Sequence, residues 1–486
     1  MSGLISGDEF IKTFPSCDAA IVGATRASLW QATYVSLYEI GCGAYVMLFG
    51  VLIQVTAFKD HKAAEQFVIG RIITGVGNGM NTATIPTWHA ETAKSHNRGL
   101  LVCIEASMIA SGTAVAYWID YAFSFNHSSA NWRIPIALQS IFAFGLLAGI
   151  MYLPESPRWL ISNGQLVEGR RVIAALEPAR YESEEVALNT RVILDSLEGA
   201  QKQKISDLLT NGPTQHFRRM AIGASSQSSL LLSSRGVDVR RPDLVLASPV
   251  FQQIGGCNAV IYFAPIIFEQ NLKLSRNMSL ILGGVNVTVY ALAAFASYVT
   301  IERVGRRKLF LIGSAGQALS MFIIMACLIP GTPEVIKGAV FGLFLYLIFF
   351  GFTWLELPWL YPAEINPLRT RTNANATSTI CNWLFNFAIV EATPPLLTAI
   401  NWGTFLIFGV INVCFIPIIW IWYPETAGRS LEEIDIIFAV AYVEKRSYVS
   451  VAATMPSLSA SQIESEAQRL GIQEAVEAVK LAGPGH

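Results

Sequence analysis

Charged residues are scarce in this sequence: they make up 14% of the 486 residues, whereas hydrophobic residues make up 52%. A soluble domain carries about 25% charged residues, so this shortage indicates a chain that lies largely in lipid. A mean hydropathy of +0.44 agrees with that interpretation. The formal net charge of -1 gives no basis for a nucleic-acid partner.

Paired cysteines, a leader sequence and catalytic motifs are also missing. The 7 cysteines are scattered, mostly within apolar runs, and form no CxxC pair, which indicates neither a disulfide framework nor a zinc site. The N-terminal residues include Asp8, Glu9 and Lys12 and no apolar h-region, so no cleavable signal peptide is expected. Because there is no HExxH pattern and no suitably spaced pair of catalytic acids, we expect no enzyme activity, no cofactor and no metal.

Long apolar runs are what the sequence does contain, and each is long enough for a membrane-spanning helix of about 20 residues. The expected spans are 30–57, 66–88, 99–123, 133–153, 248–268, 278–300, 309–330, 338–362, 374–397 and 402–423. They predict an all-α polytopic membrane protein with two helical bundles and about ten transmembrane helices.

A polar stretch, 154–247, separates the two sets of spans. The predicted organisation is an N-terminal segment 1–29, a helical bundle 30–153, a central loop 154–247 with a probable insert 228–250, a six-helix bundle 248–423 and a tail 424–486. Most of the 34 lysines and arginines lie in alternate loops, in the central loop and in the tail. Since cytoplasmic loops hold the excess of positive charge, the central loop and the C-terminus are expected in the cytoplasm.

Motifs rich in proline, glutamate and arginine recur at the loop positions. Pro154–Trp159 reads PESPRW, Glu302–Arg307 reads ERVGRR and Pro424–Ser430 reads PETAGRS. As an ordered set they resemble the signatures of fungal sugar porters of the major facilitator superfamily. The strings TIPTWHAE and PWLYPAEI are most similar to the branch that contains fungal glycerol/proton symporters. The resemblance implies a monomeric plasma-membrane transporter that moves a hexose, a pentose or glycerol by alternating access, with protons as the coupling ion.

Acids and arginines at the cytoplasmic helix ends are candidates for gating. Such pairs can form interdomain ion pairs that hold one of two alternating conformations, although ordinary positive-inside anchoring is the alternative. The candidates are Glu91, Arg98, Glu155, Arg158, Glu302, Arg303, Arg306, Glu364, Arg369, Glu425 and Arg429.

A sugar or polyol requires hydrogen-bonding side chains that face a cavity, with an aromatic surface against its C–H face. In the fifth span, Gln252, Gln253 and Asn258 flank Gly255 and Gly256. These three polar side chains cannot share one helical face, so we expect the helix to break at the glycines.

The ninth span carries a polar stripe of Asn375, Thr379, Asn382 and Asn386 at helical spacing. We expect Asn382 and Asn386 to line the cavity and the other two to join helices. The resemblance implies this set of substrate contacts: Gln252, Gln253, Asn258, Asn286, Trp359, Asn382, Trp383 and Asn386. The two tryptophans could instead belong to an interfacial aromatic belt.

Ionisable residues within the spans are candidates for function because charge is costly there, and three of them are considered in turn. In related proton-coupled porters the arginine that matches Arg71 tunes proton release. Glu105 lies where hexose porters usually have glutamine, so it is a candidate polyol contact or proton carrier and a partner for Arg71; a structural ion pair is the alternative. Glu356 is unexpected, since many relatives have a small or apolar residue there.

The sequence departs from these relatives in three places. From the resemblance, we expect that the first family helix, with its coupling acid, is absent, that two helices are fused around 38–50 and that the segment 228–250 is extra. We therefore expect about ten helices instead of twelve and a vestigial N-terminal bundle. The hypotheses left open beside a working transporter are a nutrient sensor and a non-functional product of a mis-spliced gene.

Overall fold

The computed structural model describes residues 44–57, 63–92, 98–126, 128–176, short stretches between 180 and 222, 251–330, 332–367, 371–458 and 460–470. Every regular element within these ranges is helical, which confirms the all-α class. The predicted N-terminal segment 1–29, the start of the fused span and the insert 228–250 lie outside the described residues.

The chain divides into two compact units. One comprises Met1–Arg98 and Ile119–Glu198, and the other comprises Gly99–Trp118 and Gly199–His486. Helix α6 (Arg98–Phe123) therefore contributes residues to both units. The predicted boundary between the two bundles, at residue 153, stays a prediction.

The first unit contains a short apolar helix, Ala44–Val55, followed by α5 (Ala63–Thr92), α7 (Ala130–Ile150), α8 (Pro157–Ser162) and α9 (Leu166–Leu176). Polar contacts join the first two of these helices: the Gln54 amide, which is fully buried, donates to Thr74 Oγ1 at 2.7 Å. An amide–hydroxyl pair of this kind is a common link between apolar helices in membranes.

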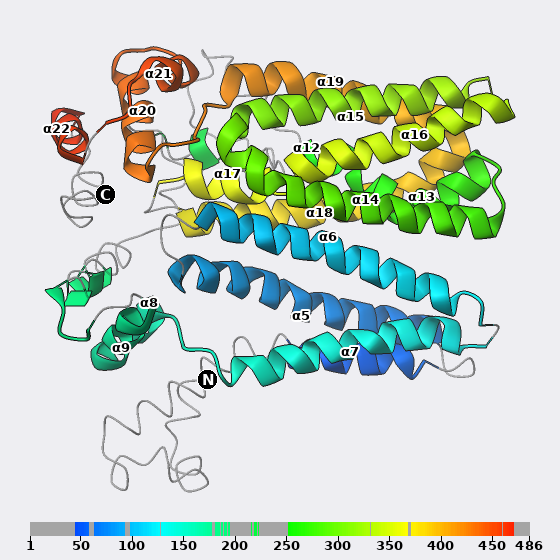
Figure 1. Ribbon diagram of the computed structural model, residues 1–486, viewed down its shortest axis with the longest axis horizontal. Coiled ribbons are helices and arrows are strands. Elements are labelled where there is room, and N and C mark those ends of the chain that lie inside the picture. The colour runs from blue at the N-terminus through cyan, green and yellow to red at the C-terminus, as the bar shows by residue number, and fades with distance from the viewer. Residues whose placement is uncertain are drawn as a thin grey trace, which may run out of the picture. The chain divides into compact units, whose positions relative to one another are not determined.

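The second unit is larger. Its membrane part contains residues 99–118 of α6, then α12 (Phe251–Ile254), α13 (Cys257–Ile266), η5 (Ile267–Asn271), α14 (Arg276–Val304), α15 (Arg306–Leu328), α16 (Pro333–Phe349), η6 (Phe350–Trp354), α17 (Leu357–Ile365), α18 (Arg371–Ile400) and α19 (Trp402–Trp422). Within it α15 lies along α19 and α16 (Figure 1). The predicted spans 278–300, 309–330 and 402–423 correspond to α14, α15 and α19.

An aromatic cluster forms one end of this core. Phe310 on α15 is fully buried, and its ring centroid lies 4.8 Å from that of Trp354, 5.5 Å from Tyr361 and 5.4 Å from Tyr423. Edge-to-face rings at these separations pack favourably. The cluster therefore fixes α15 against η6, α17 and the end of α19.

Helix α6 packs in the same core through small residues. Ala106, Ala110 and Ala114 recur every fourth residue, and all three are buried in the main cluster. One turn further, the Trp118 indole Nε1 donates to Thr288 Oγ1 on α14 at 3.0 Å. Small residues at this spacing allow two helices to approach closely.

Six helices of the described ranges are long and apolar enough to cross a membrane: Ala130–Ile150, Arg276–Val304, Arg306–Leu328, Lys337–Ile365, Ala374–Ile400 and Trp402–Trp422. The sequence predicted apolar spans in all six places. The total of ten spans stays a prediction.

After the last span the chain forms three tail helices, α20 (Leu431–Val443), α21 (Tyr448–Thr454) and α22 (Ala460–Leu470). A capping box begins α20, because the Ser430 side chain accepts from the Glu433 backbone N–H and the Glu433 carboxylate accepts from the Ser430 N–H. The tail is therefore folded as far as residue 470.

Candidate functional site

The fifth span is broken at its glycine pair, as the sequence predicted. Helix α12 ends at Ile254, a turn covers Gly255 and Gly256, and α13 begins at Cys257. Gly256 has φ +93°, and a Cβ on it would lie 2.9 Å from the Phe408 ring. Only glycine therefore fits at this position without strain.

The break leaves the Gly255 carbonyl outside a continuous helical ladder. Two buried side chains donate to it instead: the Tyr346 hydroxyl at 2.9 Å and the Asn412 amide at 3.0 Å. A buried carbonyl without such donors would be costly, so these contacts hold the turn in place. The sequence interpretation missed both residues, although an asparagine in the apolar run 405–421 was a usable signal.

Four predicted amides meet beside this turn. Asn258 Nδ2 donates to Gln253 Oε1 at 2.7 Å and to Asn386 Oδ1 at 2.9 Å, while Gln253 Nε2 donates to Asn382 Oδ1 at 3.0 Å. All four side chains are at most 9% exposed. We call Gln253, Asn258, Asn382 and Asn386 the amide cluster; it joins α12 and α13 to α18.

Gln252 points away from the amide cluster and towards η6. Its Nε2 donates to the Trp354 carbonyl at 2.8 Å, and its Oε1 is buried without a hydrogen-bond partner in the described structure. Asn286 on α14 is fully buried, and neither of its amide atoms has a partner in those ranges. Both residues thus have polar atoms that no hydrogen bond in the described residues satisfies.

The candidate tryptophans differ in exposure. Trp359 on α17 is half-buried, and its backbone N–H donates to the Glu356 carbonyl at 3.0 Å. Trp383 on α18 is 42% exposed. The role of these two tryptophans as substrate contacts, with an interfacial aromatic belt as the alternative, stays a prediction.

Arg71 and Glu105 belong to different units. Arg71 is exposed on α5, with its guanidinium 5.7 Å from the Phe67 ring centroid. Glu105 is half-buried on α6. Their predicted pairing and their role in proton coupling stay predictions.

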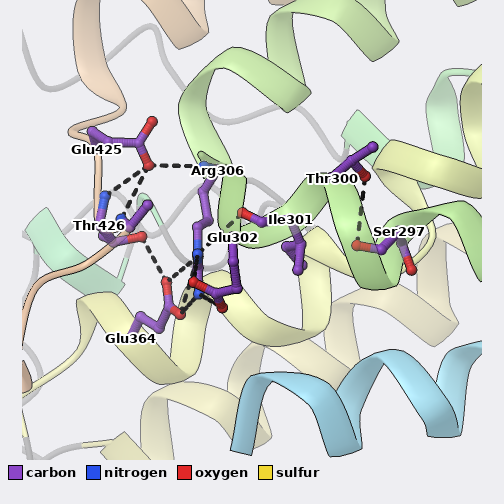
Figure 2. Close-up of polar contacts among 9 residues, drawn as sticks. Ser297, Thr300, Ile301, Glu302, Arg306, Glu364, Glu425 and Thr426 are labelled. Atoms are coloured by element: carbon purple, nitrogen blue, oxygen red, sulfur yellow. Dashed lines mark hydrogen bonds and ion pairs between the residues drawn. The ribbon is translucent and has the colours of Figure 1, made fainter. Parts of the chain in front are cut away.

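A network of ion pairs links α14, α15 and α17 at one end of the second unit (Figure 2). The buried Arg306 guanidinium contacts Glu302 at 2.8 Å and Glu364 at 2.8 Å. Thr426 Oγ1 donates to the second oxygen of Glu364 at 2.6 Å. Planar guanidinium and carboxylate groups match in such forked contacts, so these helix ends are held in one geometry.

Glu425 caps the start of α15. Its carboxylate accepts the backbone N–H groups of Arg306 at 2.8 Å and Arg307 at 3.2 Å, where the positive end of the helix dipole lies. Gly305 makes this approach possible: its φ is +91°, and a Cβ would lie 2.6 Å from the carboxylate. The observed contact is a helix cap, and the predicted gating role of Glu425 stays a prediction.

Arg429 contacts the tail. It pairs with Glu433 at 3.2 Å and donates to the backbone carbonyls of Ala452, Met455 and Pro456 around the end of α21. Arg303 is exposed, and Glu155 and Arg158 are half-buried beside the start of α8. The side chains of Glu91 and Arg98, and the whole of Arg369, lie outside the described residues.

One buried cation lies where the sequence predicted only a polar loop. Arg219 is fully buried; it pairs with Asp435 on α20, donates to the Ile365 carbonyl and lies 4.8 Å from the Phe438 ring. Nearby, Gln215 Nε2 donates to the Phe438 carbonyl at 2.6 Å. The central loop is thus tied to the tail at this point.

The comparisons with known proteins match this arrangement. The family model described as "Sugar (and other) transporter" matches residues 19–438. The chain belongs to this family. It is therefore a multi-pass membrane transporter and not an enzyme, and the expected family resemblance is confirmed.

Two fungal relatives extend the match over almost the whole chain. Sugar transporter STL1 of Saccharomyces cerevisiae is 41% identical over 495 residues, covering 97% of this chain and 83% of the relative. The major facilitator superfamily transporter mfsA of Aspergillus fumigatus is 40% identical over 500 residues, covering 97% and 88%.

A solved structure identifies the fold. The proton:xylose symporter XylE bound to 6-bromo-6-deoxy-D-glucose matches with a TM-score of 0.67 and 22% identity, covering 88% of each chain. The major facilitator fold predicted from the sequence is thereby confirmed.

Proposed function

We propose that this chain transports a monosaccharide or a polyol such as glycerol, and that the amide cluster of the second unit binds its hydroxyl groups. The observation that carries the proposal is the convergence of four buried amides beside the broken helix. An amide both donates and accepts, as a hydroxyl does, so the cluster complements an uncharged polyhydroxylated molecule.

The hydrogen bonds within the cluster support this role. Each contact between two amides can be exchanged for contacts with substrate hydroxyls at a small net change in free energy, because the number of hydrogen bonds is conserved. The free Oε1 of Gln252 adds an acceptor next to the same turn. A sugar that enters would therefore replace existing contacts and leave few polar atoms unpaired.

We further propose that transport is coupled to protons, with Arg71 and Glu105 taking part, and that the monomer acts in the plasma membrane with its C-terminus in the cytoplasm. The fungal relative named as a sugar transporter, and the neighbour named as a proton:xylose symporter, support this proposal. They do not favour a nutrient sensor or a non-functional product.

Uptake of labelled glycerol, xylose and glucose in a transporter-null host tests the proposal. N386A and N382A should each raise KM by about 3- to 10-fold, because one hydrogen bond to an uncharged group contributes about 0.5–1.5 kcal/mol. N131A, at an exposed position in the first unit, is the matched control and should leave uptake unchanged. Wild-type uptake of none of the three solutes would contradict the proposal, as would unaltered KM in both cluster variants.

A further inference from the structure

Glu356 is a carboxyl group buried within a membrane span. It lies in the turn between η6 and α17, inside the apolar segment Lys337–Ile365, and its exposed fraction is 0%. Neither of its carboxyl oxygens has a hydrogen-bond partner in the described part of the chain. No cation of those residues forms an ion pair with it.

Among the described residues, the polar groups that interact with Glu356 carry no positive charge. Ser297 and Tyr290 of α14 and Cys103 of α6 lie within electrostatic range of its carboxyl group. The charged groups that interact electrostatically with Cys103, besides Glu356, are Arg306 and Glu302 at the end of the same unit. The Arg306 guanidinium is already paired with Glu302 and with Glu364.

The hydroxyl of Ser297 bonds within its own helix. It donates to the Ala294 carbonyl at 2.7 Å, and neither oxygen of Glu356 has a hydrogen-bond partner in the described residues. This arrangement therefore leaves an ionised Glu356 without a donor to stabilise it.

Energetics lead to the same conclusion. An ionised carboxylate without a partner costs several kcal/mol in a protein interior, and a membrane adds to that cost. A group in this situation takes up a proton instead. The π-helical turn before it is a feature that often marks functional positions.

We propose that Glu356 is a proton-binding site of the C-terminal half, and that one proton bound there moves with each substrate. A proton enters from the outer solution, bonds to a carboxyl oxygen of Glu356 and leaves to cytoplasmic water when the site opens to that side. The coupling rests on the proposed function.

The position of Glu356 fits this role. Two residues earlier, the Trp354 carbonyl accepts the amide of Gln252 beside the amide cluster; eight residues later, Glu364 belongs to the Arg306 network. Glu356 thus stands in the chain between the proposed substrate contacts and the ion pairs at the helix ends. A change at either place can alter its access to water.

Infrared spectroscopy of the purified full-length protein tests proton binding without any transport. Wild-type protein at neutral pH should show the carbonyl band of a buried protonated carboxylic acid, and E356Q should lack it. E391Q, at an exposed glutamate of α18, is the matched control and should keep the band. An identical band in wild type and E356Q, or its absence from wild type, would overturn the proposal.

Transport in proteoliposomes tests the coupling. With one-to-one coupling, each pH unit of an inward proton gradient drives about tenfold accumulation, because one unit corresponds to about 1.4 kcal/mol. Wild type and E391Q should reach that accumulation, whereas E356Q should only equilibrate labelled glycerol, xylose or glucose while still exchanging it in counterflow. Accumulation by E356Q equal to wild type would overturn the coupling while leaving the proposed function intact. If wild type moves none of these solutes, the proposed function fails, the coupling falls with it, and the infrared result alone decides whether Glu356 holds a proton.

Discussion

The two glutamates that share Arg306 should contribute very unequally to stability. The guanidinium makes forked contacts with both, at 2.8 Å in each case, but the Glu302 side chain is 58% exposed and the Glu364 side chain 17%. Removing the charge of Glu364 leaves a buried cation with a single, solvated partner. We expect E364Q to lower the free energy of unfolding by about 3 kcal/mol, the cost typical of breaking a buried pair.

The matched variant is E302Q. An ion pair of this exposure contributes about 0–1 kcal/mol, because water screens it and its long side chains lose conformational entropy. E302Q should therefore unfold close to the wild-type temperature. The comparison holds Arg306 constant and changes only the environment of its partner.

Thermal unfolding of the purified protein in detergent, followed by tryptophan fluorescence, measures both variants. The Tm of E364Q should fall well below that of E302Q. Added salt should shrink the small E302Q effect and leave the E364Q effect largely unchanged, since buried pairs are screened less. Equal shifts, or a larger one for E302Q, would show that burial does not determine the contribution of these pairs.

Three further variants have expected outcomes in the same assay. G256A should destabilise by about 1–3 kcal/mol, because a side chain there is strained at φ +93° and meets the Phe408 ring; a wild-type Tm would contradict the need for glycine. Y361F should cost about 1 kcal/mol by removing the 2.9 Å hydrogen bond to the Pro424 carbonyl, and no change would mean that water replaces the hydroxyl. Burial raises the pKa of the Tyr448 phenol. The contribution of the neutral phenol to folding stability is therefore fully present below the ordinary pKa of about 10 and is lost as pH rises through the raised pKa. Y448F should keep neutral-pH stability, since that hydroxyl has no hydrogen-bond partner in the described structure, and should lose less stability in alkali; an unaltered alkaline transition would count against this.

The spans and the helix break were predictable because their causes are local. An apolar run of sufficient length has few alternatives to a membrane helix, so 309–330 and 402–423 agree closely with α15 and α19. The break at Gly255 and Gly256 followed from three polar residues that could not share a face. Likewise, the spacing of Asn382 and Asn386 placed both on one side of α18, where they meet Asn258 and Gln253.

The partners of the charged residues were not predictable, because they come from distant parts of the chain. Glu425 accepts from backbone groups 119 residues earlier, and Arg219 donates to a carbonyl 146 residues later. A motif shows that an acid or an arginine is present, but it does not show whether that residue pairs, caps a helix or binds a tail. Hydrophilicity was also misleading for Arg219, since a charged side chain in a polar loop is normally solvated.

The distribution of polar groups in the second unit follows from what each can do in lipid. Amides within the spans pair with one another, because neutral groups can exchange partners at little cost, while the carboxylates and the guanidinium of the Arg306 network pair at the helix ends. Glu356 breaks this pattern, because it is a fully buried carboxyl group and no cation of the described residues pairs with it. It fits the pattern only in its protonated form, in which it is one more neutral group. With a proton bound to Glu356, the C-terminal half therefore has neutral polar groups within its spans and keeps its paired charges at the helix ends.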